Sequence, residues 1–430
     1  MKTSPASAYW GLRLTILTSV LWSVGLFAGF KTALLANVVA TFALAAIGIF
    51  RPTVAVFTVA YLACLDSISR MYLIDSGLFR WNALNYLLLV LLFVCLPTVL
   101  KASDIHSIIL LLFVALLVAG LLVTPDIENG VQHVLNIATS FGILACFMRA
   151  RRDTSLWLWV AVLNGVAVAI GGLVFYLDPQ ALRLNPNGWS LFPLAGMFSI
   201  CLASLKPPRN SVSPFLVLLA AVAFGWTFLS GSRGSTLVAL ICTLFLIGAE
   251  KQRSRRAGYL AVWALVCLGL AVWFATSGQG ALHRIEYTFD SDKSITGRSS
   301  GRWDLIVAGW RIFLEHPLGV GTGGYSVSFA ELGDEHLAFR GFTRQAHAGW
   351  IKTLVENGIA GTLIFAAYVC SFAYYGWRRR RQGWLALGLL TSTVLAIYFG
   401  FSEFQGKCVW LLAAGAAAVM DARSEGTIHA

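Results

Sequence analysis

The sequence predicts an all-α protein, a polytopic transmembrane bundle of about 12 to 14 helical spans. Apolar runs of about 15 to 25 residues recur along the chain, and a helix of about 20 residues crosses a hydrocarbon core. Only 12% of the residues are charged and 58% are hydrophobic, whereas soluble proteins carry about 25% charged residues. The runs do not alternate apolar and polar residues as the strands of a membrane barrel do.

The expected spans follow one another from end to end of the chain. Three of them, 53–66, 235–249 and 408–420, are short, so some runs could be re-entrant or belong to one element. An even number of spans places both termini on the same side of the membrane. In chain order the candidate spans are 10–29, 33–50, 53–66, 83–100, 107–123, 132–148, 155–177, 189–205, 212–229, 235–249, 258–276, 349–377, 384–401 and 408–420.

Basic residues gather in alternate short loops, as in the KQRSRR run at 251–256 and the run Arg378–Arg381. Loops of this kind lie in the cytoplasm by the positive-inside rule. The loop 277–346 is on the other side and is therefore expected outside. The formal net charge of +12 thus indicates membrane topology, with membrane lipids as partners and no nucleic acid.

The chain is expected to form one integral membrane domain, 1–430, capped on its outer face by the large loop 277–346. Within this loop, WDLIVAGWRIFLEH at 303–316 has apolar residues at helical spacing and Pro317 just after it. This pattern predicts a helix that lies on the membrane surface. A second helix is expected to begin near Gly341 and to run through His347 into the next span.

Five arginines in or beside the outer loops are candidates for binding an anionic group. A lone arginine at a membrane surface often only reaches toward the headgroups, and basic residues along a loop are most often a solvated surface. However, planar guanidinium groups match phosphate oxygens bidentately, so the alternative interpretation is a clamp for a diphosphate. The candidates are Arg233 in LSGSRGSTL, Arg298 and Arg302 at a spacing of four, and Arg340 and Arg344.

His347 is the candidate general base. A histidine at this place is usually structural, but imidazole is the side chain best suited to accept a hydroxyl proton at neutral pH. Its spacing of three from Arg344 would put both on one helix face. His316 and His336 lack such company, and no zinc-ligand spacing is present, so neither a metal nor a cofactor is expected.

Two further patterns invite functional interpretations that their context does not support. Gly319, Gly321 and Gly324 fit G-x-G-x-x-G, but no strand precedes them, so a tight turn is expected there and not a dinucleotide site. Asp290 and Asp292 mimic the D-x-D of nucleotide-sugar transferases. Nucleotide sugars are cytoplasmic, whereas this loop is expected outside.

Three motifs together resemble the O-antigen ligase and polymerase superfamily of bacterial envelope glycosyltransferases. They are SGSRG at 230–234, Arg302-Trp303 with a downstream HPLGVGTGGY, and H-x-x-W-x-x-x-x-x-E-x-G-x-x-G at 347–361. The resemblance implies a metal-independent transferase of about twelve spans that takes a glycan from undecaprenyl diphosphate on the periplasmic side. The family's essential residues would fall on Arg233, Arg302 and His347. Many members have asparagine where this chain has Ala348.

The resemblance therefore leads us to expect an O-antigen ligase of the bacterial inner membrane, inverting and with its active site facing the periplasm. Its donor would be an undecaprenyl diphosphate-linked glycan and its acceptor lipid A-core. Arg298, Arg340 and Arg344 would contribute to substrate binding. A polymerase that extends the same lipid-linked chains is the nearest alternative, followed by a protein O-oligosaccharyltransferase. A transporter is a remote alternative, because ionisable groups gather in one outer loop and not at midplane.

Overall fold

The structure, a computed structural model, describes residues 5–75, 105–149, 155–178, 186–207, 212–277, 302–332, 346–402 and 407–421. All regular elements within these ranges are helical, which confirms the predicted all-α class. Seven helices in the described ranges are long and apolar enough to cross a membrane, and five more apolar helices are shorter. The protein is therefore a polytopic helical membrane protein.

The helices of most predicted spans begin and end close to the predicted bounds, but the helix predicted at 53–66 continues to Asp75, well beyond its predicted end. Span 83–100 lies outside the described residues. In chain order the helices are α1 (Pro5–Ala28), α2 (Phe30–Phe50), α3 (Pro52–Asp75), α5 (Ile105–Gly120), α6 (Ile127–Arg149), α7 (Leu156–Leu177), α8 (Pro186–Trp189), α9 (Leu191–Leu205), α10 (Pro214–Leu229), α11 (Arg233–Ala249), α12 (Arg253–Ser277), α15 (Arg302–Glu315), α16 (Tyr325–Glu331), α17 (Gly349–Arg378), the 3-10 turn η2 (Arg380–Gln382), α18 (Leu385–Phe401) and α19 (Lys407–Asp421).

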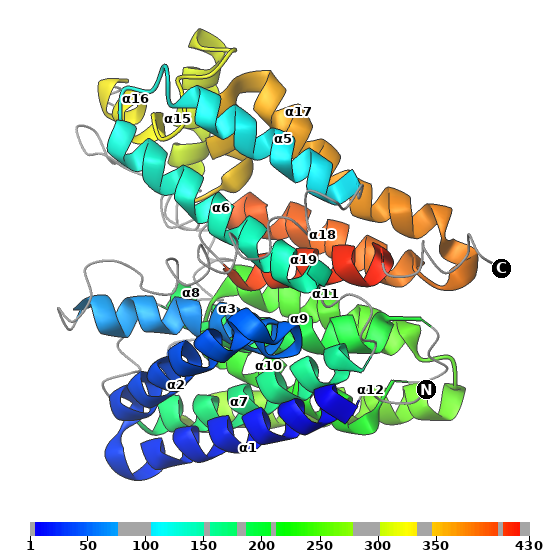
Figure 1. Cartoon of the computed structure of the whole chain (residues 1–430). Helices are drawn as coiled ribbons and strands as arrows, with labels where there is room; N and C mark the ends of the chain where they lie inside the picture. Colours follow the sequence, from blue (N-terminus) through cyan, green and yellow to red (C-terminus); the bar gives the residue numbers. More distant parts are fainter. Residues whose placement is uncertain are drawn as a thin grey trace.

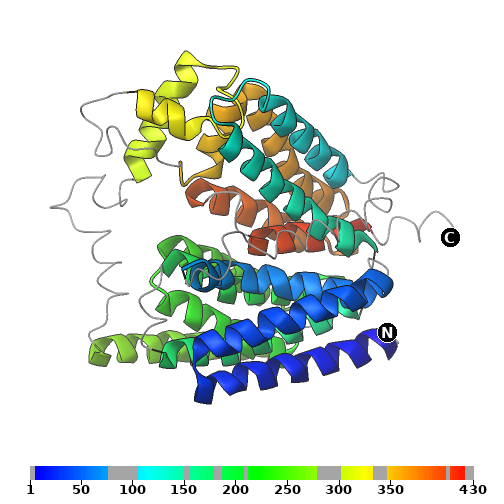
Figure 2. The same ribbon diagram turned by 60° about the vertical axis from the view of Figure 1, so that its left-hand side comes forward.

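Most helices lie side by side with their axes running in one general direction (Figures 1 and 2). α17 packs on α5 and α18, α19 on α6 and α9, and α1 on α2 and α7. The start of α1 and the end of α19 lie at one end of the bundle, as an even number of spans predicts (Figure 1). The start of α12 and the end of α17, with their basic runs, lie at this end, whereas α15 and α16 lie at the other.

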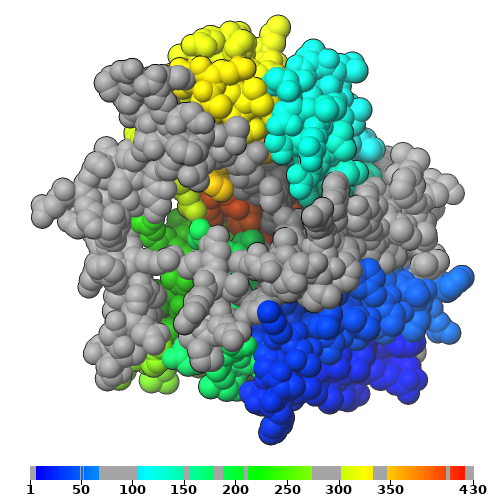
Figure 3. All heavy atoms as spheres, turned by 90° about the vertical axis from the view of Figure 1, so that its left-hand side faces the viewer, coloured from blue at the N-terminus to red at the C-terminus, as the bar shows by residue number. Residues whose placement is uncertain are grey.

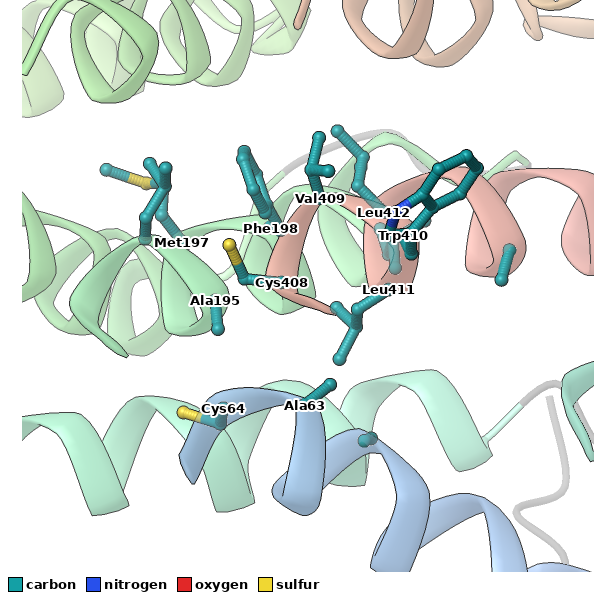
Figure 4. Close-up of a cluster of buried hydrophobic side chains, with 14 of the residues drawn as sticks. Ala63, Cys64, Ala195, Met197, Phe198, Cys408, Val409, Trp410, Leu411 and Leu412 are labelled. Carbon is teal, nitrogen blue, oxygen red and sulfur yellow. The ribbon is translucent and has the colours of Figure 1, made fainter. Parts of the chain in front are cut away.

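Three helices form the centre of the bundle. α3, α9 and α19 contribute small and aromatic side chains to its main core, and every residue of α19 from Lys407 to Met420 is buried. Figure 4 shows Cys408 and Val409 of α19 above Cys64 of α3 and beside Phe198 of α9. A helix that is buried on all sides needs apolar residues all round, which explains the unbroken apolar run at 408–420.

A second, smaller core fastens α15 and α16 to the beginning of α17. Spacings of three and four put the buried face of α15 on one side of that helix. The opposite face of α15 exposes Trp303 and Trp310. The predicted helix at 303–316 is thus confirmed, and its place on the membrane surface remains a prediction. The buried members of the second core are Leu305, Ala308, Ile312, Tyr325, Phe329, Ala346 and Val355.

Candidate active site

The three residues predicted to be catalytic all lie at the N-terminal ends of helices. Arg233 and Arg302 are the first residues of α11 and α15, and His347 lies two residues before the start of α17. Neither Ser232 before α11 nor Ala348 before α17 makes a side-chain cap hydrogen bond. The first N–H groups of a helix lack partners within it, and the helix dipole adds positive potential there. Such ends favour anions.

Arg233 and Arg302 lie close enough for their charges to interact, although they belong to distant parts of the chain. Burial, and in second place the positive charge of Arg233, lower the pKa of Arg302 below the usual arginine value. Guanidinium groups carry their positive charge throughout the physiological range. Two like charges at short range repel each other, and a bound anion would offset that repulsion. The pair therefore suits a phosphate or diphosphate group.

The end of α18 connects the start of α11 with the start of α17. A Cβ on Gly234, the residue after Arg233, would overlap the Phe401 ring. The backbone N–H of Gly349 donates a hydrogen bond of 2.9 Å to the carbonyl oxygen of Ser402, the residue after Phe401. Figure 3 looks onto this end of the molecule and shows green, orange and red atoms in a hollow below the yellow segment. The three catalytic candidates thus share one region.

His347 has an unusual backbone conformation for a residue with a side chain. Its φ is 48°, in the left-handed region, and no other described non-glycine residue has a positive φ. Ala346 and Ala348 on either side are buried, whereas His347 is exposed. The left-handed residue thus lets both alanines point inward while the imidazole stays accessible.

The predicted helix from Gly341 through His347 is wrong at its C-terminal end. α17 begins at Gly349, after Ala348 in an extended conformation (φ −144°). The reason is tertiary, because the Gly349 N–H donates a hydrogen bond to the carbonyl oxygen of Ser402, directly after α18, and the turn at His347 breaks the helical path. The spacing between Arg344 and His347 therefore does not place them on one helix face.

Polar side chains beside Arg233 form a cluster that sequence reasoning did not find. Ser232 Oγ donates to Asn187 Oδ1 at 3.0 Å, and the hydroxyls of Ser190 and Ser235 are 2.7 Å apart. Asn187 and Ser190 come from α8 and the turn after it, more than forty residues before Arg233. No sequence pattern connects the two segments. These groups hold the start of α11, and with it Arg233, against α8 and α9.

The glycine-rich segment 316–325 forms a tight turn, as predicted. Gly319 (φ 97°), Gly321 (φ 93°) and Gly323 (φ 90°) are in conformations that favour glycine. A Cβ on Gly319 would overlap the backbone of α17, and one on Gly321 would overlap Thr124 after α5. The segment follows α15 directly. It therefore fixes where α15, with Arg302 at its far end, lies against α5 and α17.

Three arginines that were assigned to substrate binding lie outside the described residues, so their roles stay predictions. The same holds for the D-x-D pair. Within the described part of the chain, no three His, Cys, Asp or Glu side chains gather as a metal site would require. The residues concerned are Arg298, Arg340, Arg344, Asp290 and Asp292.

Fold and site together define a class: a polytopic helical membrane protein with a cationic, solvent-accessible site at one end of its bundle. Residues 215–366 match the family model described as O-Antigen ligase, and this segment contains all three catalytic candidates. The match covers about a third of the chain and supports the resemblance to the O-antigen ligase superfamily that the motifs predicted. The match supports an O-antigen ligase-like glycosyltransferase activity in general, and that family implies lipid-linked polysaccharides as substrates. No curated protein matches the chain.

Proposed function

We propose that this protein is an O-antigen ligase that transfers polysaccharide from undecaprenyl diphosphate to lipid A-core. The transfer takes place at the periplasmic face of the inner membrane, needs no metal ion and inverts the configuration at the anomeric carbon. One observation carries this proposal: the charges of Arg233 and Arg302 interact. Both arginines lie in the region where α17 begins, just after His347.

The two arginines bind the diphosphate of the donor. Guanidinium groups donate paired hydrogen bonds to phosphate oxygens. Diphosphate leaves as an anion and needs stabilisation of its growing negative charge more than it needs a proton. Fixed positive groups at the place where negative charge develops supply that stabilisation. In other enzymes a bound metal ion supplies it. Arg233 and Arg302 supply the charge here.

His347 takes the proton from the acceptor. The acceptor hydroxyl oxygen forms a bond to the anomeric carbon as the bond from that carbon to the diphosphate oxygen breaks. The bonding electrons leave with undecaprenyl diphosphate, and the hydroxyl proton moves to a ring nitrogen of His347. Because attack and departure occur on opposite faces of the carbon, the product has inverted configuration. Water then removes the proton from the exposed imidazole.

The charges of the described helix ends support the proposed topology. The basic runs at the start of α12 and at the end of α17 lie at one end of the bundle, and α15 lies at the other (Figure 1). Because basic loops stay in the cytoplasm, the end with α15 and the catalytic residues faces the periplasm. There the loop 277–346 caps the site, and the exposed tryptophans of α15 rest at the headgroup level, where tryptophan is enriched.

A reconstitution assay tests the proposal. Purified protein in a chelator-containing buffer is incubated with an undecaprenyl diphosphate-linked glycan, with and without lipid A-core, and the products are separated on a gel. A new band that requires lipid A-core supports the ligase. A ladder of longer lipid-linked glycans from donor alone would make the protein a polymerase, and no product in either tube would reopen the transporter alternative.

A further inference from the structure

A buried ion network lies beneath the glycine-rich segment 316–325. The Glu356 carboxylate accepts a hydrogen bond from His133 Nδ1 through Oε2, at 2.9 Å. Its other oxygen, Oε1, lies 3.7 Å from the ammonium nitrogen of Lys352, one turn earlier on α17. All three side chains are buried. His133 belongs to α6, so the network connects α17 with α6.

Glu356 also holds the glycine-rich segment, through its backbone and its side chain. Its carbonyl oxygen accepts the N–H of Gly321 at 3.0 Å, and the preceding carbonyl of Val355 accepts the N–H of Val320 at 2.9 Å. The backbone N–H of Gly323 interacts favourably with the Glu356 carboxylate. One residue therefore connects three elements: α6, α17 and the segment that follows α15.

The network around Glu356 is connected to Arg302 and His347 through α17 and the glycine-rich segment. α17 is interrupted at Gly358, whose φ of 61° is not helical. The short stretch 349–357 before this kink has His347 just ahead of it and Glu356 near its end. The glycine-rich segment is joined to α15, which begins with Arg302. A shift of the segment relative to α17 would therefore change the distance between Arg302 and His347.

We propose that Glu356, supported by His133 and Lys352, is a positioning residue for the transfer reaction. It fixes the segment 316–325 on α17 and thereby the place of Arg302 relative to His347. This inference rests on the proposed function. Glu356 itself is buried and acts through the residues that it holds.

Stability alone does not explain the network well. Removing charges from water is costly, and a buried ion pair often stabilises a fold no better than apolar side chains of the same volume. A network of this kind does impose fixed directions, because carboxylate, imidazole and N–H groups interact only in particular geometries. Catalytic rates respond steeply to such geometry, since a displacement of about 1 Å can lower a rate about 100-fold.

A matched pair of substitutions at His133 tests the inference. His133→Ala removes the hydrogen bond to Glu356, whereas His133→Asn keeps an N–H donor close to the position of Nδ1. Each variant is reconstituted and assayed for transfer, and hydrogen exchange is measured in the peptide that contains residues 316–325. His133→Ala should lower kcat at least about 10-fold with little change in KM for the donor, and it should speed exchange in this peptide. His133→Asn should resemble the wild type in both.

A second pair separates positioning from simple charge balance. Glu356→Gln leaves Lys352 as a buried charge without its carboxylate and could lower activity through misfolding alone. The double variant Glu356→Gln with Lys352→Met removes that charge as well and should recover the wild-type thermal midpoint. The inference predicts that kcat stays low in the folded double variant, because Gln no longer holds His133 and Gly323 as the carboxylate does.

Three results would overturn the inference: full activity of His133→Ala, unchanged exchange in its 316–325 peptide, or recovery of kcat in the double variant. Failure of the proposed function would look different. In that case the wild-type protein would form no product with any lipid-linked donor, and the exchange measurements would decide on their own whether Glu356 holds the segment.

Discussion

Arg233 lies close enough to Arg302 for its positive charge to lower the pKa of Arg302. Burial of Arg302 is the larger cause of this lowering, and the charge of Arg233 is the second. The N-terminal ends of α11 and α15 therefore lie close together, although the length of α11, the whole of α12 and the residues 278–301 separate them in the chain. A protein gains nothing in stability from holding two guanidinium groups in this way. The arrangement is explained if the physiological ligand is an anion with at least two charges.

Arg302→Ala should lower transfer at least about 100-fold, as the loss of one group that stabilises developing charge does in other enzymes. Arg302→Lys should recover only part of this loss, because an ammonium group lacks the planar fork that binds phosphate bidentately. Initial rates in proteoliposomes measure both. Arg311→Ala, an exposed arginine on the same helix, is the control and should stay within about 2-fold of the wild type. A comparable loss there would point to general charge effects.

His347→Gly should separate catalysis from folding. Glycine adopts a φ of 48° without the cost of about 1 kcal/mol that other residues meet in the left-handed region. The thermal midpoint of His347→Gly should therefore be at least as high as that of His347→Ala. Transfer should fall about 100-fold or more in both variants, because the proton acceptor is gone. Added imidazole should restore part of the activity of His347→Gly, since the position is exposed. Full activity without imidazole would remove His347 from the mechanism.

The glycine-rich segment should tolerate no side chain at its left-handed positions. Gly321→Ala and Gly323→Ala place a Cβ against the backbone of Thr124 and Gly130 and strain the local backbone, at a cost of about 2 kcal/mol each. Gly248→Ala, in α11, meets open space and should be nearly neutral. Thermal unfolding in detergent gives the three midpoints. Equal midpoints would mean that the segment does not dock as described.

Gly234 and Phe401 should show a size-dependent coupling. Gly234→Ala forces a methyl group into the Phe401 ring and should displace Arg233, lowering transfer about 10-fold. Phe401→Ala makes room for that methyl group, so the double variant should be more active than Gly234→Ala alone. A double-mutant cycle on initial rates measures the coupling. Strictly additive effects would indicate that α18 does not set the position of Arg233.

The helices were predictable from the sequence because apolar length alone determines a membrane span. The runs at 155–177 and 349–377 correspond closely to α7 and α17. The conformation of His347 was not predictable, since it depends on Ser402, more than fifty residues away, accepting the first N–H group of α17. Local spacing favoured a continuous helix there, and a tertiary hydrogen bond overrode it.

The chemistry of the site was predictable only in part. Arg233, Arg302 and His347 were singled out by residue type and by motif, and the structure describes all three in one region. Glu356 and Asn187 acquire their importance from partners on other helices, His133 for the first and Ser232 for the second. A single sequence carries no signal for such pairings, because the partners lie dozens to hundreds of residues away.

The most direct test compares donor binding with turnover in one series of variants. Affinity for an undecaprenyl diphosphate-linked glycan and the rate of its transfer are measured for the wild type, Arg233→Ala, Arg302→Ala and His347→Ala, all confirmed as folded. The account predicts that both arginine variants lose donor affinity together with turnover, whereas His347→Ala binds the donor like the wild type and does not transfer it. Wild-type turnover in any of the three variants, or loss of donor binding only in His347→Ala, would contradict it.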